Sequence, residues 1–170
     1  MKLIFRLALT PPIAALGAFL ASVAALGSAY ITEYAFNIYP CELCLWQRGP
    51  LWGVVFGAAL LLALGRRSGL SAVLLGALTL LFAGEAGIAF FHVGVEQHWW
   101  MGTGACTAKE AAGGSATDLT AQLLGTPVAR CDQVAWRLFD ISIPTWNVPF
   151  SLLMFAWMLM ATVKAVRHGK

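Results

Sequence analysis

Four long apolar blocks, separated by polar segments, constrain the fold of this chain more than any other feature. A membrane-spanning helix needs roughly 20 apolar residues, because it rises about 1.5 Å per residue across a hydrocarbon core of about 30 Å. Only 11% of the 170 residues are charged, against about 25% in soluble domains, and the deficit falls within the blocks. We therefore expect an all-α membrane protein, a four-transmembrane-helix bundle that forms one integral membrane domain over residues 1–170. The predicted spans cover about residues 7–31, 49–65, 70–95 and 148–163.

The first block is longer than the apolar core of a secretory signal peptide, which has roughly 7–15 residues. Small residues at 27–29 form a weak cleavage site, but the length of the block predicts a retained span. Small side chains also recur along one side of this helix and predict a face that packs closely on another helix. These residues are Ala14, Gly17, Ala18, Ala21 and Ala25.

The basic residues predict how the bundle is oriented, because Lys and Arg concentrate in the cytoplasmic loops of membrane proteins. Seven of the eleven lie at the ends of the chain or in the short link after the second block: Lys2, Arg6, Arg66, Arg67, Lys164, Arg167 and Lys170. We therefore expect both termini in the cytoplasm and two loops, about 32–48 and 96–147, on the far side. All four cysteines fall in these loops, which suits an oxidising compartment.

A Cys-x-x-Cys pair, Cys41 and Cys44, stands at the mouth of the second block, and Arg48 follows four residues later. If the helix has begun by Cys44, this cysteine and Arg48 share one face, because residues four apart stack along a helix. A helix N-terminus and an arginine both favour the reactive thiolate, whereas Glu42 weakly opposes it. The second block spans only about 25 Å, so Arg48 must lie close to a membrane boundary. The segment predicts a redox centre at the membrane surface.

Other uses of the cysteines have weaker support in the sequence. A zinc site needs a second close pair or histidines. Cys106 and Cys131 are 25 residues apart, and His92 and His98 belong to a predicted helix end, so we expect no metal. Covalent haem requires a histidine directly after the second cysteine, and Leu45 stands there. A Cys106–Cys131 disulfide would stabilise the folded state by about 3 kcal/mol, because it closes a loop of about 25 residues. The residues leave open whether this pair is a structural staple or a redox relay.

Glu85 is the only acidic residue inside a predicted span, about 27 Å beyond Arg67 and therefore near the outer boundary. It is either a carboxylate that reaches interfacial water or a partner for Arg48. His92 lies seven residues further on the same helix face, and Glu96 follows one turn later. This histidine is either an ordinary interface residue or a group that supplies or accepts a proton.

The long outer loop carries two further expectations. Residues 118–124 are predicted to form one amphipathic helical stretch. Residues 134–146 are rich in aromatic side chains, which favours a position at the lipid headgroups, as it does for Trp99 and Trp100.

Three motifs stand at the ends of the predicted spans. Pro40-Cys41-x-Leu43-Cys44-x-x-Gln47-Arg48 opens the second span, Phe91-His92-Val93-Gly94-Val95-Glu96 ends the third, and Cys131-Asp132-Gln133-Val134-Ala135-Trp136 precedes the last. Together they closely resemble the disulfide-bond-formation protein B (DsbB) family, over essentially the whole chain. The resemblance implies a multi-pass enzyme of the bacterial inner membrane with two periplasmic loops. Such an enzyme reoxidises a periplasmic thioredoxin-fold oxidant, a DsbA-like protein, and passes the electrons to membrane quinone, either ubiquinone or menaquinone.

The resemblance also assigns roles to the four cysteines. Cys106 would receive the partner's thiolate and form a mixed disulfide, with Cys131 as its internal mate. Cys41 would exchange with this loop pair. Cys44 would face the quinone, so the electrons would leave the protein from the inner pair.

At the quinone, the resemblance gives Arg48 the task of holding a quinone oxygen. We expect Glu85 to orient the guanidinium if the two pair, and His92 to serve the proton step. Two other functions remain open: a vitamin-K-epoxide-reductase-like membrane thiol oxidoreductase, and a non-catalytic tetraspan protein whose disulfides only hold its loops. Turnover with a reduced thioredoxin-fold substrate and quinone separates them. The basic residues stand at block ends and indicate no nucleic-acid partner. Besides the DsbA-like protein and the quinone pool, the expected partner is membrane lipid.

Overall fold

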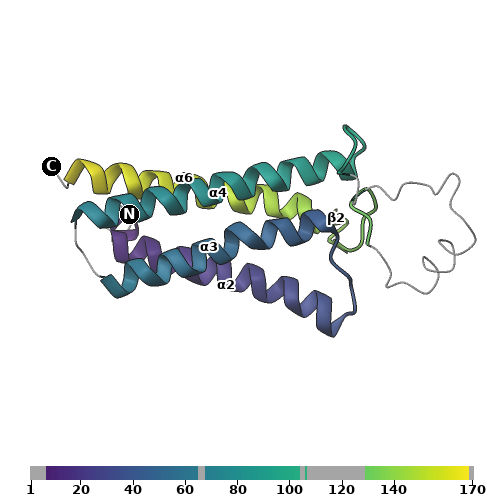
Figure 1. The fold of residues 1–170 in the computed structure, drawn as a ribbon, viewed down its shortest axis with the longest axis horizontal. Helices are drawn as coiled ribbons and strands as arrows, with labels where there is room; N and C mark the ends of the chain where they lie inside the picture. The colour runs from purple at the N-terminus through teal and green to yellow at the C-terminus, as the bar shows by residue number, and fades with distance from the viewer. Residues whose placement is uncertain (1–6, 65–67, 104–105, 107–128, 169–170) are drawn as a thin grey trace, which may run out of the picture.

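The computed structural model describes residues 7–64, 68–103, 106 and 129–168. Four long helices lie side by side in it (Figure 1): α2 (Pro11–Ala35), α3 (Glu42–Leu64), α4 (Ser68–Glu96) and α6 (Ile143–His168). Each is long and apolar enough to cross a membrane. A short antiparallel hairpin of β1 (Arg137–Leu138) and β2 (Ile141–Ser142) precedes the last helix. The prediction of a four-helix membrane bundle is confirmed.

Two helices begin earlier than the apolar blocks predict. α3 starts at Glu42 rather than near residue 49, and α6 starts at Ile143 rather than near residue 148. Hydropathy marks only the part of a helix that suits lipid, whereas the backbone hydrogen bonds continue into the polar interface. Pro50 and Pro149 lie within these helices, and membrane helices tolerate such internal prolines. The early start of α3 brings Cys44 into the helix, one turn before Arg48.

The main hydrophobic core takes buried side chains from all four helices, among them Ala18, Val54, Phe82 and Met158. The small side chains of α2 contribute over part of the predicted face. Trp157 of α6 lies so close to Gly17 that a Cβ there would overlap its ring. Helices in lipid associate through such close contacts, because there is no water to expel. Ala21 and Ala25 instead line a cavity further along α2.

The start of α2 and the end of α6 lie at one end of the bundle, and the hairpin lies at the other (Figure 1). Towards this second end, called the outer end below, α2 diverges from α3 (Figure 1). The arrangement agrees with an even number of spans. Which end faces the cytoplasm stays a prediction from the basic residues, and those at positions 2, 6, 66, 67 and 170 lie outside the described residues.

The predicted helical stretch 118–124 also lies outside the described residues. The aromatic segment 134–146 contains the hairpin, and its last four residues belong to α6. Phe139 and Asp140 form the hairpin turn with φ angles of 54° and 61°, the geometry that tight two-residue hairpins favour. Trp146 donates a hydrogen bond to the Leu138 carbonyl at 3.1 Å, which fastens the hairpin to the start of α6. The location of this segment at the lipid headgroups stays a prediction.

Candidate active site

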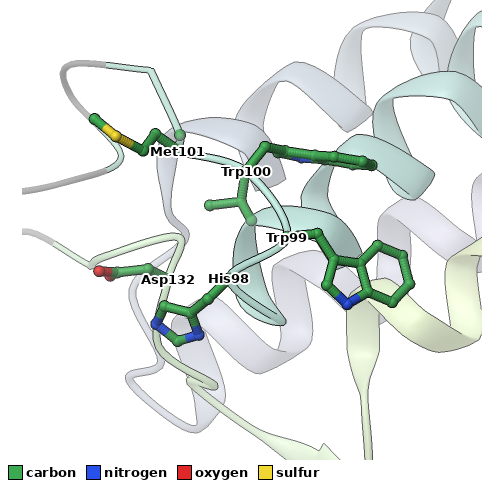
Figure 2. A pocket seen from close by; sticks show the side chains of 7 residues that line it. His98, Trp99, Trp100, Met101 and Asp132 are labelled. Atoms are coloured by element: carbon green, nitrogen blue, oxygen red, sulfur yellow. The ribbon is translucent and has the colours of Figure 1, made fainter.

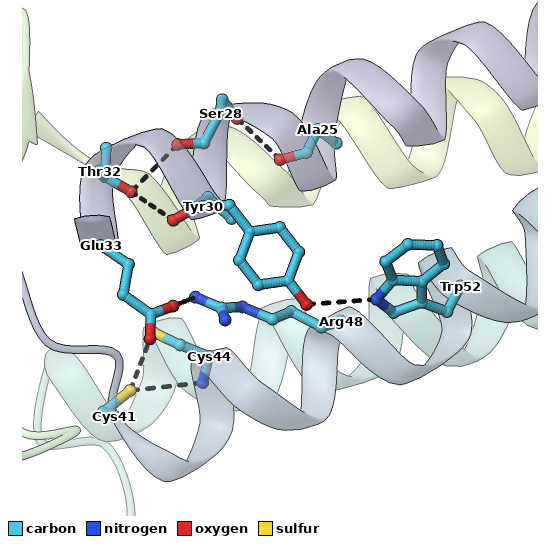
Figure 3. A network of polar contacts seen from close by, with 10 residues as sticks. Ala25, Ser28, Tyr30, Thr32, Glu33, Cys41, Cys44, Arg48 and Trp52 are labelled. Carbon is cyan, nitrogen blue, oxygen red and sulfur yellow. Dashed lines mark hydrogen bonds and ion pairs between the residues drawn. The ribbon is translucent and has the colours of Figure 1, made fainter. Parts of the chain in front are cut away.

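α3 starts at the outer end of the bundle (Figure 1). Cys41 directly precedes this helix and Cys44 lies in its first turn (Figure 3). Their sulfur atoms are 3.0 Å apart, and the backbone N–H of Cys44 donates to the Cys41 sulfur at 3.3 Å. From α4, the Nε2 atom of His92 approaches the same sulfur to 3.5 Å. The hydrogen bond with the Cys44 thiol lowers the pKa of Cys41, burial opposes this shift, and His92 lowers the pKa further. Cys41 therefore has the character of a reactive thiolate.

His92 is buried beside the dithiol. Its second ring nitrogen, Nδ1, has no hydrogen-bond partner among the residues that the structure describes. Glu96, one turn later on α4, lines the same cavity as His92. Of the two predicted alternatives, this position favours a group that exchanges a proton. The role itself stays a prediction.

Arg48 lies one turn after Cys44 and pairs with a carboxylate of α2 (Figure 3). Its guanidinium is 2.6 Å from Glu33 Oε2, and its central carbon lies 4.6 Å from the centre of the Tyr30 ring. The Tyr30 hydroxyl in turn accepts a hydrogen bond from Trp52 at 3.4 Å. This network orients the Arg48 side chain, and Glu33 balances its charge.

The predicted alternative in which Glu85 pairs with Arg48 is wrong. Glu85 is fully buried, and it accepts a hydrogen bond from Asn147 Nδ2 of α6 at 2.6 Å. Its carboxylate therefore does not reach interfacial water, which was the other predicted alternative. Spacing in the sequence sets the depth of a residue along a helix, but not which neighbouring helix its side chain meets. Asn147, and not Glu85, lines the cavity that Arg48 lines.

A cavity of about 670 Å³ lies between α2, α3 and the start of α6 at the outer end. Cys44, Gln47 and Arg48 line it from α3, and its apolar lining includes Leu51, Trp136, Ile143, Trp146 and Phe150. Its size falls within the roughly 300–1,000 Å³ of small-molecule sites. Two buried donors, Gln47 Nε2 and Arg48 Nε, have no hydrogen-bond partner in the described part of the chain. A largely apolar ligand with hydrogen-bond acceptors matches these features.

Cys106 and Cys131 form a disulfide, the pairing that the family resemblance implied. Both residues are buried, and they share one apolar cluster with Cys41, Leu43 and Val95. The fold therefore brings the two cysteine pairs together at the outer end. A redox relay needs this proximity, whereas a structural staple does not.

A smaller cavity of about 260 Å³ adjoins the loop that follows α4 (Figure 2). His98, Trp99, Trp100, Met101 and Asp132 line it. Asp132 accepts two hydrogen bonds from Arg130, at 2.9 and 2.7 Å, and the guanidinium lowers the pKa of this carboxyl. No thiol and no unpaired carboxylate lines this cavity among the described residues, so the larger cavity is the better candidate for chemistry.

The sulfur atoms of Cys41 and Cys44 and one ring nitrogen of His92 lie within 4.8 Å of one another. Thiolate and imidazole are ligands that zinc prefers, so the reduced pair could hold a soft divalent ion. The sequence predicted no metal, because residue spacing alone did not bring His92 to the cysteines. The same arrangement also serves a redox dithiol, whose thiolate a neighbouring imidazole stabilises.

Comparison with known proteins identifies the family of this chain. The sequence model of the family described as "Disulfide bond formation protein DsbB" matches residues 11–161. This chain belongs to the DsbB family. It is also 33% identical over 156 residues to Disulfide bond formation protein B 2 of Pseudomonas fluorescens (strain Pf0-1), and the match covers 86% of this chain and 79% of that protein. No solved structure matches it.

Membership in the DsbB family, together with four membrane-spanning helices, has direct consequences. This DsbB-family protein is a multi-pass protein of the bacterial inner membrane. It is a thiol oxidoreductase that acts in disulfide-bond formation.

Reasoning from the sequence missed Glu33, Tyr30 and Asn147 as parts of this region. One signal was available for Glu33, since it is a lone acidic residue just after the first apolar block and a buried arginine requires a counter-charge. Asn147 is likewise the polar residue directly before the last predicted span. Nothing in the sequence indicated which group each of them would contact.

Proposed function

We propose that this DsbB-family protein oxidises a reduced periplasmic DsbA-like partner and passes the electrons to membrane quinone. One observation carries the proposal: Cys44 and Arg48 line the same cavity, so a dithiol and a fixed cation meet at one site of ligand size. The cavity lies between membrane-spanning helices. A lipid-soluble oxidant is therefore the chemical class that suits it.

The residues present fit a quinone head group. Arg48 and Gln47 each carry a buried donor without a partner among the described residues, and quinone oxygens are acceptors. Aromatic side chains such as Trp136 and Trp146 are suited to contact the ring. When bound, quinone supplies a two-electron oxidant. The fixed charge of Arg48 would stabilise negative charge on the oxygen that it holds.

In this proposal the electrons enter through the loop pair. A thiolate of the partner attacks the Cys106 sulfur, a mixed disulfide forms, and Cys131 leaves as a thiolate. The second thiolate of the partner then breaks the mixed disulfide, so the partner is oxidised and the loop pair is reduced. The loop pair in turn reduces a Cys41–Cys44 disulfide, and two electrons leave the inner pair from the side of Cys44.

This route requires the outer end of the bundle to face the periplasm. Lys164 and Arg167 support this orientation, because they belong to the last turns of α6, at the end opposite the hairpin (Figure 1). Both termini are then cytoplasmic, and all four cysteines meet the oxidising side.

Anaerobic quinone reduction by the purified protein tests the proposal. With a reduced DsbA-like protein as donor, each partner disulfide formed should be matched by one reduced ubiquinone or menaquinone. Cys44→Ser should abolish quinone reduction. Absence of turnover, with disulfides that resist the reduced partner, would indicate a non-catalytic tetraspan protein. Reduction of vitamin K epoxide in preference to quinone would instead favour the vitamin-K-epoxide-reductase-like alternative.

A further inference from the structure

Glu42 connects the two cysteine pairs. It is the first residue of α3 and stands between Cys41 and Cys44. Its Oε2 atom accepts a hydrogen bond from the Thr103 hydroxyl at 2.6 Å and lies 3.8 Å from the Cys106 sulfur. The side chain thus reaches from the helix that carries the inner pair to the segment that carries the loop pair.

Thr103 and Cys106 belong to one turn, because the Cys106 N–H donates to the Thr103 carbonyl at 2.9 Å. The Cys131 N–H donates in turn to the Cys106 carbonyl at 3.2 Å. Gly102 allows this turn to pack closely, since a Cβ there would lie only 2.7 Å from the Cβ of Cys106. The turn that the carboxylate holds therefore places both loop cysteines.

The chemistry of the dithiol alone does not account for a carboxylate at this position. A negative charge beside Cys41 disfavours its thiolate, which is the reactive form. The contact with the loop offers a compensating gain. Glu42 and Thr103 are both partly buried, and a hydrogen bond to a carboxylate is stronger than one between neutral groups.

We propose that Glu42 is a positioning residue for disulfide exchange between the two cysteine pairs. The inference rests on the proposed function, because it takes the loop pair as the electron donor to the inner pair. Exchange requires the attacking sulfur to be held close to its target and aligned with it. The hydrogen bond from Thr103 to Glu42 holds the loop pair at the residue next to Cys41.

The exchange itself balances in two steps. A loop thiolate attacks Cys41 of the Cys41–Cys44 disulfide, a bond forms between the loop sulfur and Cys41, and Cys44 leaves as a thiolate. The second loop thiolate then attacks the loop sulfur of this mixed disulfide, which reforms Cys106–Cys131 and releases Cys41 as a thiolate. Two electrons move from the loop pair to the inner pair, and the protons lost by the loop thiols balance those that the inner pair takes up.

Two matched pairs of substitutions test the inference. Glu42→Leu removes the acceptor, whereas Glu42→Gln keeps a carbonyl oxygen in its place. Thr103→Val removes the hydroxyl, whereas Thr103→Ser keeps it. Asp140→Asn, at the exposed hairpin turn, controls for the loss of one negative charge at the outer end.

Fully oxidised full-length protein without quinone is mixed with one equivalent of reduced DsbA-like partner and quenched with acid. The redox state of each cysteine pair is then read by alkylation and mass spectrometry.

We expect Glu42→Leu and Thr103→Val each to slow electron transfer from the loop pair to the inner pair about tenfold, the effect of one charge-assisted hydrogen bond on a rate. The double variant should be no slower than either single variant, because both changes remove the same contact. Thr103→Ser and Asp140→Asn should stay within about twofold of the wild-type rate. Glu42→Gln keeps an acceptor but loses the charge, so it should be slowed less than Glu42→Leu. Reduction of the loop pair by the partner should keep its wild-type rate in every variant.

Three results would overturn the inference. One is a wild-type exchange rate in Glu42→Leu, and another is a loss in the double variant that equals the product of the two single losses. The third is an equal slowing of the partner reaction, which would mean that Glu42 only helps the loop to fold. If the wild-type protein moves no electrons from the loop pair to the inner pair, the proposed function fails instead.

Discussion

Arg48 of α3 and Glu33 of α2 form an ion pair at 2.6 Å that joins two helices lining the larger cavity. The Tyr30 ring packs against the guanidinium, with 4.6 Å between the Arg48 central carbon and the ring centre. A largely buried charge needs a partner of this kind, because its removal from water is costly. Arg48 is therefore held in one orientation by the protein itself, which is what a preorganised binding site requires.

Substitution of Arg48 should weaken the use of quinone. Arg48→Ala removes a charged hydrogen-bond donor worth about 1.5–3 kcal/mol, so the KM for quinone should rise by roughly tenfold to a hundredfold. Arg48→Lys keeps the charge but loses the planar fork and should be intermediate. Glu33→Gln should have a smaller effect in the same direction. Steady-state quinone reduction measures these values, and an unchanged KM in Arg48→Ala would contradict the assignment. Single-turnover oxidation of the partner is the control and should keep its rate.

The hydrogen bond between Asn147 and Glu85 should contribute to stability rather than to quinone binding. Asn147→Leu leaves a fully buried carboxyl without its donor and should lower the free energy of unfolding by about 1–3 kcal/mol. The double variant Glu85→Leu/Asn147→Leu should recover part of this loss, because no polar group is then left unpaired. Denaturation in detergent measures both variants. Glu85→Gln should leave the KM for quinone unchanged, and a rise would restore a role for Glu85 at the cavity.

Replacement of single loop cysteines should distinguish their roles. Cys131→Ser leaves Cys106 as a free thiol, which should attack the disulfide of an oxidised DsbA-like partner and form a mixed disulfide. This bond should be trapped, because the internal mate that would displace the partner is missing. Cys106→Ser should trap none. Non-reducing electrophoresis and peptide mapping detect the bond. A trapped bond at Cys131 would reverse the proposed order of the relay.

Cys41 should react with a small alkylating reagent at pH 6 when both loop cysteines are replaced by serine. An ordinary thiol, with a pKa near 8.5, is only about 0.3% thiolate at that pH. The pKa of Cys41 is lowered, so its thiolate persists as the pH falls below that ordinary value. Cys44→Ala removes the largest cause and should move the reactivity curve to higher pH. Cys44→Ser, which keeps a hydroxyl donor, should move it less. Mass spectrometry measures the alkylation rates. If the protein that lacks only the two loop cysteines shows the pH dependence of an ordinary thiol, the prediction is wrong.

Labelling from outside should establish the orientation of the bundle. Three of the native cysteines are buried, so introduced cysteines are better probes. Met101 is 84% exposed near the outer end, and Val166 is 48% exposed near the end of α6. In a chain whose native cysteines are replaced by serine, a membrane-impermeant thiol reagent should label Met101→Cys in intact spheroplasts. Val166→Cys should react only after lysis, and the opposite pattern would reverse the predicted topology.

The number of spans and the position of the dithiol could be predicted because a bilayer restricts helices to a narrow range of lengths and compositions. The helix starts at Glu42 and Ile143 could not be predicted. The apolar pattern ends where polar residues begin, whereas the helical hydrogen bonds of the backbone continue through them. The redox role of the Cys106–Cys131 pair followed from the family resemblance alone. Residue spacing had left it undecided between a staple and a relay.

The sequence by itself determined which residues bring chemistry to this protein: the cysteines, Arg48 and His92 are recognisable by their type and their place along a span. Only the tertiary structure decided which of them meet. It brings His92 to Cys41 and gives Arg48 a carboxylate, Glu33, from a helix that the sequence did not connect with it. The physical reason is that position along a helix follows directly from residue number, at about 1.5 Å per residue. The partner across the interface depends on the rotation and tilt of two helices, which the packing of their side chains sets.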